Sequence, residues 1–200
     1  MSTHSAVTSV PIHDLLAERW SPVVFADQPV EPAALRAMVE AARLAPSSFN
    51  EQPWAYIVAT RDNSAQFEKL ASVLVEGNAW AKKAPLLLLS VAKQNFDHNG
   101  KPNRHAGHDV GMATAQLIVQ AGAFGLFVHQ MAGFDAKKAR GIFSIPADWE
   151  PMAMIAVGYN DPIGPADEKL RRREAGPRNR KPLESFVFAG AWGQAAPIVK

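Results

Sequence analysis

The chain has 200 residues and a formal net charge of +2; 48% of its residues are hydrophobic and 20% are charged. Such a chain is long enough to bury a core, and its near-balanced charge gives no indication of a nucleic-acid-binding surface. The absence of cysteine excludes disulfides, thiol nucleophiles and thiolate metal sites. The N-terminus lacks the pattern of a signal peptide, and the longest apolar run is too short to span a bilayer, so we expect a cytoplasmic protein.

Helical and extended patterns alternate along the chain after a loose polar arm at residues 1–10. The spacing of apolar residues predicts helices over 12–18, from Pro32 onward, and over 63–75, 104–125 and 135–142, the last with Asp135 as its N-cap. Short apolar runs predict strands over 54–60, 84–92, 126–131 and 152–158. The long polar loop at 94–105 is a candidate lid or rim. This order predicts a single domain over residues 1–200 with an α/β or α+β sandwich fold.

Two features predict a second subunit. The helix expected over 104–125 is apolar nearly all round, and a helix of this kind must be covered on every side. In a chain this small, another copy of the protein is the expected cover. The tail at 182–200 is also too apolar to remain in solvent, and we expect it to pack as an extended segment on the partner subunit.

The stretch APSSFNEQPWAYIVA, residues 45–59, places an unusual number of polar side chains directly before a predicted strand. Its two serines, Asn50 and Gln52 supply several hydrogen-bond donors and acceptors within a few residues. A surface turn would explain only part of this cluster. Its composition suits a polar ligand held at the edge of a rigid sheet.

Arginines cluster near both ends of the chain, in RWS at 19–21 and in RNRK at 178–181. A guanidinium fork binds phosphate and a serine hydroxyl adds a donor, so two such clusters can converge on one dianion. The alternative is that both clusters are solvated surface. A third segment, QMAGFD at 130–135, joins a strand to a helix, and its glycine either lets backbone amides approach a ligand or simply makes a turn.

Other candidate sites are weaker. His105, His108 and Asp109 lie within one helical turn and would suit a metal-dependent hydrolase, although a catalytic zinc normally needs three convergent ligands. A helix start with capping and hydrogen-bonding roles is the competing interpretation, and RRRE at 171–174 is typical of a solvated charge run. The sequence contains no Rossmann fingerprint, P-loop or serine-hydrolase elbow, and no side chain stands out as a general acid or base. If the protein is an enzyme, a cofactor is expected to carry the chemistry.

Five features follow one another along the chain: R-x-S, APSS-x-N-x-QPW, an asparagine before an apolar strand, a strand ending in a GF turn, and R-x-RKPL. In this order they resemble the nitroreductase family of FMN-dependent oxidoreductases. The resemblance is especially to short members with an AWGQ-type tail, and it extends from about Leu15 to Trp192. It implies an α+β fold, a nitroreductase-like α/β/α sandwich with a central, mainly antiparallel sheet. It also implies an intertwined homodimer with two FMN molecules at the subunit interface.

The resemblance assigns FMN-binding roles position by position. Arg19 and Ser21, with Trp20 between them, are expected at the phosphate or ribityl chain, and Arg178 and Arg180 are expected to close on the phosphate from the C-terminal side. The remaining positions are those that the family uses along the flavin: Pro46, Ser47, Ser48, Asn50 and Gln52 from the partner subunit, Asn78 at the polar edge of the ring, and Met131, Ala132 and Gly133 in the turn facing N5 and O4.

The sequence departs from the family pattern at two points. Members of the family often have arginines where this chain has Trp20 and Val23, and some carry an acidic residue at the position of Ala132. We expect the first difference to weaken FMN binding or to alter the preference for nicotinamide phosphate. The second removes any role of an acidic side chain in the turn.

The activity implied by the resemblance is the reduction of electrophilic acceptors, such as nitroaromatics, quinones or conjugated carbonyls, with electrons from NADH or NADPH. The chemistry would lie at N5 of FMN in a ping-pong cycle, with no catalytic side chain and no metal. Two alternatives remain open: a dedicated reductase of one small aldehyde or enone metabolite, and a non-catalytic protein that stores or senses FMN. The sequence does not choose between the two nicotinamide donors.

Overall fold

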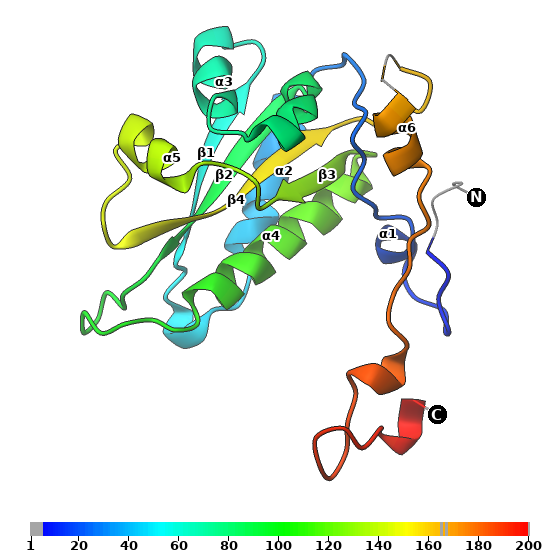
Figure 1. Cartoon of the computed structure of the whole chain (residues 1–200). Coiled ribbons are helices and arrows are strands. Elements are labelled where there is room, and N and C mark those ends of the chain that lie inside the picture. The colour runs from blue at the N-terminus through cyan, green and yellow to red at the C-terminus, as the bar shows by residue number, and fades with distance from the viewer. Residues whose placement is uncertain (1–5, 165, 167, 200) are drawn as a thin grey trace.

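The computed structural model describes residues 6–164, 166 and 168–199. Within these residues the centre of the fold is a four-stranded sheet in which the strands have the order β1-β2-β4-β3 (Figure 1). The strands are β1 (Trp54–Thr60), β2 (Leu86–Lys93), β3 (Phe127–Met131) and β4 (Trp149–Gly158). All three neighbouring pairs are antiparallel, so the prediction of an α+β fold with an antiparallel sheet is confirmed.

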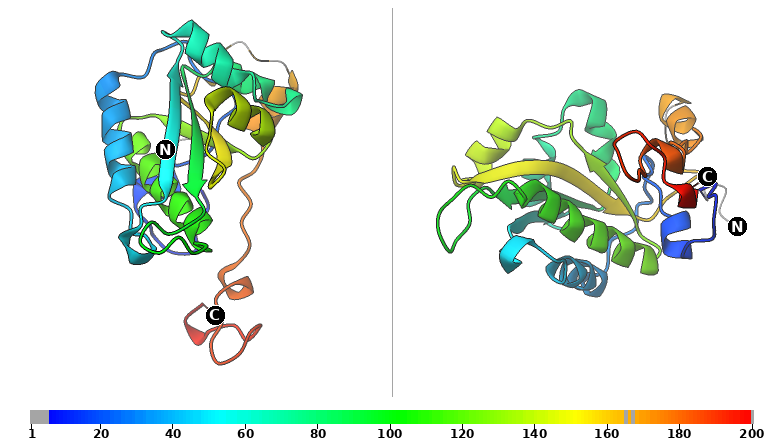
Figure 2. Two further views of the ribbon diagram at one scale, coloured as in Figure 1. Left: turned by 90° about the vertical axis from the view of Figure 1, so that its left-hand side faces the viewer. Right: turned by 90° about the horizontal axis from the view of Figure 1, so that it is seen from below.

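Helices cover both faces of the sheet, which lies between two helical layers in the right-hand view of Figure 2. One layer contains α2 (Pro32–Arg43) and α4 (Ala106–Ala123). The other contains α3 (Ser64–Ala71), the 3-10 helix η2 (Glu76–Lys83) and α5 (Ala136–Phe143).

The central strand β2 supplies side chains to both layers. Leu86 and Leu88 pack in the core beneath α2 and α4, whereas Leu87 and Leu89 pack in the core beneath α3 and α5. This alternation follows from the two-residue period of a strand. Because both faces of β2 are covered, its whole apolar run is buried, as the sequence predicted.

Polar caps and one proline set where the helices begin. α2 begins at Pro32, whose fixed φ suits the first helical turn. The side chain of Asn63 accepts a hydrogen bond from the Gln66 amide at the start of α3. The side chain of Asp135 accepts one from the Lys138 amide at 2.9 Å at the start of α5, so the predicted N-cap is confirmed.

Most predicted boundaries lie within about two residues of those observed, but two are wrong by more than that. The helix expected over 63–75 ends at Ala71, because the chain beyond it turns so that Leu74 can form an isolated β-bridge with Phe134. The strand expected to start at residue 152 begins at Trp149, where it pairs with Lys93 at the end of β2. In both cases a tertiary pairing overrides the local apolar pattern.

α4 carries two different surfaces. Ala113 and Leu117 are buried against α2 and the sheet and Val110 is buried against the sheet, while Gly111 and Ala115 on the opposite surface are exposed. The second subunit expected to cover this exposed surface stays a prediction. α4, like every other helix in the described part of the chain, is not long and apolar enough to cross a membrane.

The two ends of the chain lie at one side of the sheet, where α1 (Asp14–Ala17) is near α6 (Glu168–Glu174) (Figure 1). Of the arm predicted at 1–10, residues 1–5 lie outside the described residues, and 6–10 contain neither helix nor strand. After α6 the chain leaves the body as an extended tail with two 3-10 turns, η3 (Leu183–Ser185) and η4 (Pro197–Val199). That this tail packs on a partner subunit also stays a prediction.

Candidate functional site

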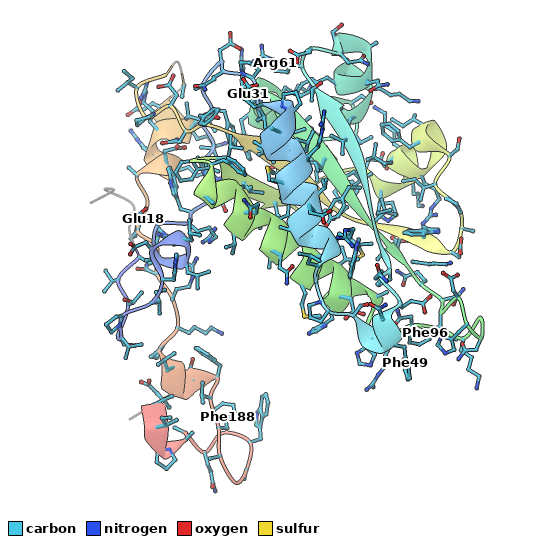
Figure 3. All side chains as sticks on the ribbon, turned by 180° about the vertical axis from the view of Figure 1, so that it is seen from behind. Glu18, Glu31, Phe49, Arg61, Phe96 and Phe188 are labelled. Carbon is cyan, nitrogen blue, oxygen red and sulfur yellow. The ribbon has the colours of Figure 1, made fainter. Side chains whose placement is uncertain are left out.

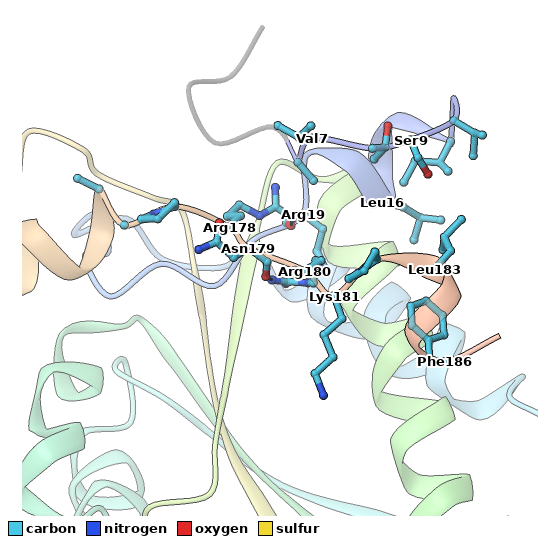
Figure 4. A pocket seen from close by; sticks show the side chains of 18 residues that line it. Val7, Ser9, Leu16, Arg19, Arg178, Asn179, Arg180, Lys181, Leu183 and Phe186 are labelled. Atoms are coloured by element: carbon cyan, nitrogen blue, oxygen red, sulfur yellow. Dashed lines mark hydrogen bonds between the residues drawn. The ribbon is translucent and has the colours of Figure 1, made fainter. Parts of the chain in front are cut away.

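The arginines from the two ends of the chain lie together. Arg178 reaches the N-terminal segment, where its Nη1 donates to the Ala17 carbonyl at 2.9 Å and its Nη2 donates to the Arg19 carbonyl at 2.5 Å. Arg180 donates through Nη1 to the carbonyl of the residue before it. Figure 4 shows Arg19, Arg178 and Arg180 gathered between α1 and the tail. The structure thus joins two arginine clusters that are about 160 residues apart in the sequence.

Burial and mutual repulsion act on the guanidinium groups of Arg19 and Arg178. Burial, followed by the charge of Arg180, lowers the pKa of Arg19 below its ordinary value. Burial also lowers the pKa of Arg178, with further contributions from the charges of Arg19 and Arg180. Among the described residues, neither Arg19 nor Arg180 forms an ion pair with a carboxylate. Cations held together in this way favour the binding of an anion.

A groove of about 1470 Å³ lies beside these arginines, with one wall from the N-terminal segment and the other from residues 175–186 (Figure 4). Its polar side is formed by the arginines and Lys181. Apolar side chains line much of the rest: Val7, Val10, Ile12, Leu16, Leu183 and Phe186. An open groove with this many exposed apolar side chains is typical of a surface that another chain covers.

The residues from Arg19 to Val23 point in different directions. Ser21 is exposed, and its Oγ accepts a hydrogen bond from Arg19 Nη1 at 3.4 Å. Trp20 is buried, and its ring packs edge-on against Phe127 with 5.9 Å between ring centroids. Val23 is buried in the core beneath α3. The positions where the family often has arginine are therefore core positions here, and any contact of Trp20 with a phosphate would come from its backbone.

A half-buried histidine in the middle of β3 contacts the segment that follows Arg19. His129 Nδ1 donates to the Pro22 carbonyl at 2.8 Å, which assigns its proton because a carbonyl can only accept. Its ring lies 4.6 Å from that of Trp80. Burial is the main cause that lowers the pKa of His129, only partly offset by the hydrogen bond to Pro22, so the imidazole is neutral at pH 7.

The turn after β3 meets Asn78. Asn78 Nδ2 donates to the Gly133 carbonyl at 2.9 Å. A Cβ at residue 133 would lie 2.6 Å from that Nδ2 and 3.0 Å from a methyl of Val75, so the close approach requires glycine. Met131 is buried as the last paired residue of β3, and Ala132 is exposed. The amides of Ala132 and Gly133 therefore lie beyond the strand ladder, where a ligand can meet them.

Segment 46–52 forms a turn with an unusual backbone. Three of its residues have positive φ, with values of 55°, 55° and 52°: Phe49, Asn50 and Gln52. The Ser47 hydroxyl oxygen accepts a hydrogen bond from the Gln52 amide at 2.9 Å, and the Ser48 amide donates to Asp109 Oδ2 at 3.0 Å. Pro46 is exposed at the start of the turn. Side chains on both sides thus hold a backbone that residues other than glycine rarely adopt.

This turn and the arginines lie at opposite ends of α4. Asp109, in the first turns of α4, holds Ser48, whereas α1 lies at the other end, where a Cβ on Gly122 would be 3.4 Å from Leu15. The stretch of helix between Asp109 and Gly122 is about 20 Å long. Figure 3 likewise places Phe49 and Glu18 at opposite ends of the molecule. A compact site that contains both sets of residues therefore requires a second chain.

Comparisons with known proteins show the family of the chain. The family model described as the nitroreductase family matches residues 16–79 and 74–159. The chain belongs to the nitroreductase family. It is 38% identical over 127 residues to a 15.4 kDa protein of Mycolicibacterium smegmatis, which covers 64% of this chain and 84% of the relative. It is 29% identical over 191 residues to the NADH dehydrogenase of Thermus thermophilus, covering 80% of this chain and 86% of the relative. A crystal structure of an oxidoreductase containing FMN shares 32% identity and a TM-score of 0.87, over 94% of this chain and 96% of the other.

In this nitroreductase-family chain, sequence reasoning missed residues that shape the site. Glu174 accepts a hydrogen bond from the Val23 amide at 2.9 Å, and the Arg173 guanidinium lies 5.5 Å from the centroid of the Trp80 ring. The expectation that RRRE is only a solvated charge run is therefore wrong for Arg173 and Glu174, and also for Arg171, whose Nη2 donates to the Gly164 carbonyl at 2.6 Å. A glutamate that ends an arginine run, and a histidine inside a strand such as His129, were the signals available.

The histidines at the start of α4 have structural contacts. His108 Nδ1 lies 3.1 Å from Asp109 Oδ1, and the other carboxylate oxygen of Asp109 holds the turn at 46–52. The predicted hydrogen-bonding role is confirmed for Asp109. The side chain of His105, the N-cap residue of α4, makes no capping bond, so the predicted capping role is wrong for His105; its own amide donates to Asn103 Oδ1 at 3.0 Å. No group of three His, Asp or Glu side chains suited to a metal is found within the described ranges.

Proposed function

We propose that the protein is an FMN-dependent oxidoreductase that takes electrons from NADH or NADPH and passes them to electrophilic acceptors. The observation that carries this proposal is the convergence of Arg19, Arg178 and Arg180 on one groove. Three guanidinium groups and the nearby Ser21 hydroxyl match the charge and the acceptor oxygens of a phosphate monoester. The FMN-containing oxidoreductase that shares 32% identity supports the cofactor, and relatives named NADH dehydrogenase and NAD(P)H nitroreductase support the donor.

The residues along β3 fit the rest of FMN. The stretch from Phe127 to Gly133 covers about 20 Å, which is long enough for an extended nucleotide. At its far end the amides of Ala132 and Gly133 can donate to acceptor atoms of a ring. Asn78 uses Nδ2 on Gly133, and its Oδ1 can accept from a ring N–H. A cationic end and a mixed donor–acceptor end are the two kinds of site that FMN requires.

FMN, when bound, supplies the hydride and electron transfer in this proposal. The role of the chain is to bind and orient. Arg19 and Arg180 hold the phosphate, Asn78 fixes the polar edge of the ring, and the amides beyond β3 place donors beside it. Pre-formed donors of this kind cost little reorganisation when charge develops on the ring.

The proposed active unit is a homodimer in which the turn at 46–52 serves the FMN of the partner subunit. This proposal is supported by the opposite positions of the turn and the arginines along α4. Ser47, Ser48 and Asn50, with Pro46 and Gln52 beside them, would complete the site from the other chain. The exposed surface of α4 and the apolar tail supply area for the interface.

The proposed acceptors are nitroaromatics, quinones and conjugated carbonyls, because planar electrophiles can stack on a planar ring. The test begins with the absorbance spectrum of the purified protein and with identification of the flavin released on denaturation. Anaerobic NADH or NADPH should bleach the bound flavin, and added acceptor should restore its colour. Colourless protein that also fails to bind added FMN would overturn the proposal. Protein that binds FMN but is not bleached by either nucleotide would instead be a store or sensor of FMN.

A further inference from the structure

Phe49 is an anomaly in the surface of this protein. Its side chain is 81% exposed, and its φ of 55° lies in the left-handed region, which bulky residues rarely adopt. Asparagine or glycine would fit this backbone with less strain, and a polar residue would fit the exposure better. Strained backbone that persists in a well-held turn points to a function of the side chain itself.

Phe49 is part of an aromatic cluster that joins two segments. Its ring centroid lies 5.7 Å from that of Phe96 in an edge-to-face arrangement and 5.5 Å from that of His98. Phe96 and His98 are themselves 5.2 Å apart. These distances are in the range of favourable aromatic pairs. Figure 3 shows Phe49 and Phe96 beside each other at the end of the molecule formed by the turn 46–52 and the loop 94–105.

Glu51 connects this aromatic cluster to the loop at 94–105. Its side chain is only 5% exposed, and its Oε1 accepts a hydrogen bond from the Asp97 amide at 2.5 Å. Its Oε2 lies 3.5 Å from His98 Nδ1. The loop that carries Phe96 and His98 is thus attached to the turn that carries Phe49.

Phe49 lines an open cavity of about 560 Å³. The other residues that line it are polar: Asn50, Glu51, Asp97 and His98. One aromatic face among polar groups suits a small planar molecule with polar substituents. It is less suited to the apolar surface of a protein partner, which would leave these polar groups without water.

We propose that Phe49, supported by Phe96 and His98, is a stacking platform that selects planar aromatic acceptors. This inference rests on the proposed function, because Phe49 lies between Ser48 and Asn50, which would face the FMN of the partner subunit. The electron-rich faces of phenylalanine rings favour electron-poor rings such as those of nitroaromatics. Phe49 is then a specificity-determining residue, and its exposure and strained backbone follow from that role.

The test compares Phe49→Leu, which keeps an apolar side chain, with Phe49→Tyr, which keeps the ring. Binding of 1,3-dicyanobenzene, an electron-poor planar ring without a nitro group, is measured on the FMN-loaded protein by equilibrium dialysis. KM is then measured with nitrobenzene and with ferricyanide, which cannot stack. Phe49→Asn is a second variant without the ring, and asparagine tolerates the positive φ at this position. Phe124→Leu, at the opposite end of α4, is the control.

We expect Phe49→Leu and Phe49→Asn to raise the Kd of 1,3-dicyanobenzene and the KM of nitrobenzene about fivefold to tenfold. Phe49→Tyr and Phe124→Leu should stay within about twofold of the wild type, and ferricyanide should be unaffected by all four changes. Wild-type binding in both ring-free variants would overturn the platform, as would equal losses with ferricyanide. A drop to monomer mass in light scattering would also overturn it, since Phe49 would then be a subunit contact. The wild-type spectrum and its bleaching by NADH report separately on the proposed function.

Discussion

The carbonyl oxygen of Gly133 accepts a hydrogen bond from Asn78 Nδ2 at 2.9 Å. This bond joins η2 to the turn after β3, two segments that are 55 residues apart in the sequence. It forms only because residue 133 has no Cβ to occupy the place of the amide. The pair therefore fixes together the two groups that we propose for the polar edge of FMN.

Gly133→Ala should separate this pair. The new Cβ would lie 2.6 Å from Asn78 Nδ2, so the amide must move and its hydrogen bond is lost. We expect the free energy of unfolding to fall by about 1–2 kcal/mol and FMN affinity to fall as well. Thermal unfolding of the apo-protein and titration with FMN measure the two effects.

Gly141→Ala is the matched control for that change. Residue 141 lies inside α5, and a Cβ there would meet no atom within 4 Å. Alanine is the better helix former, so this variant should gain about 0.4–1 kcal/mol and bind FMN as the wild type does. A loss of stability at 141 equal to that at 133 would show that the Asn78 contact is not the cause.

Trp192→Ser should weaken the proposed homodimer. The Trp192 side chain is 93% exposed on the tail and touches Phe188 with 5.1 Å between ring centroids. Exposed tryptophans that become buried on association are among the strongest interface contacts. We expect the dimer dissociation constant to rise at least about tenfold, as measured by sedimentation over a range of protein concentrations. The control is Ile163→Ser, because Ile163 is 89% exposed but lies off the tail. A dimer equally stable in both variants would mean that the tail does not pack on the partner.

Most of the sheet could be predicted from the sequence because its strands are bounded by clear signals. β1 was placed at 54–60 with both ends correct, since Pro53 precedes an apolar run and a polar turn follows it. Leu74 and Val75 continue the apolar pattern of α3 without joining the helix. Only the bridge of Leu74 to Phe134 shows that they belong to another pairing, and that contact has no local signature.

The parts of the site that depend on the type of side chain could be predicted from the sequence. Arginines at the two ends of the chain share one chemistry, and the structure brings them together. The backbone acceptors that position Arg178 could not be predicted, because every residue has a carbonyl and only the fold selects one. The left-handed backbone of Phe49 could not be predicted either, since glycine or asparagine is the usual signal for that conformation.

His129 should make stability depend on pH. Burial lowers its pKa in the folded state, whereas its ordinary value of 6.5 applies in the unfolded chain. The unfolded state then binds the proton more readily, so the stabilisation is complete above pH 6.5 and is lost as the pH falls below that value. We expect His129→Gln, whose amide can still donate to the Pro22 carbonyl, to lose less stability than the wild type between pH 7 and about 5. Denaturant unfolding at several pH values measures this difference, and parallel curves would contradict it.

Arg180→Ala should weaken FMN binding without harming the fold. Arg180 donates only to the carbonyl of the preceding residue, whereas Arg178 holds two carbonyls of the N-terminal segment, so position 180 is the cleaner test. The charge of Arg180 also lowers the pKa of Arg19, which shows that the two guanidinium groups repel each other. Removing the Arg180 side chain relieves this repulsion and should not destabilise the apo-protein. Loss of one charge-assisted contact with a phosphate should cost about 1.5–3 kcal/mol, or about tenfold to a hundredfold in affinity.

The control is Arg172→Ala, which removes an ion pair with Glu168 whose two side chains are each 77% exposed, and it should change FMN affinity little. Fluorescence titration of both apo variants with FMN at fixed salt, alongside their melting curves, decides the outcome: equal losses would indicate a diffuse basic field, and wild-type binding by Arg180→Ala would remove Arg180 from the phosphate site.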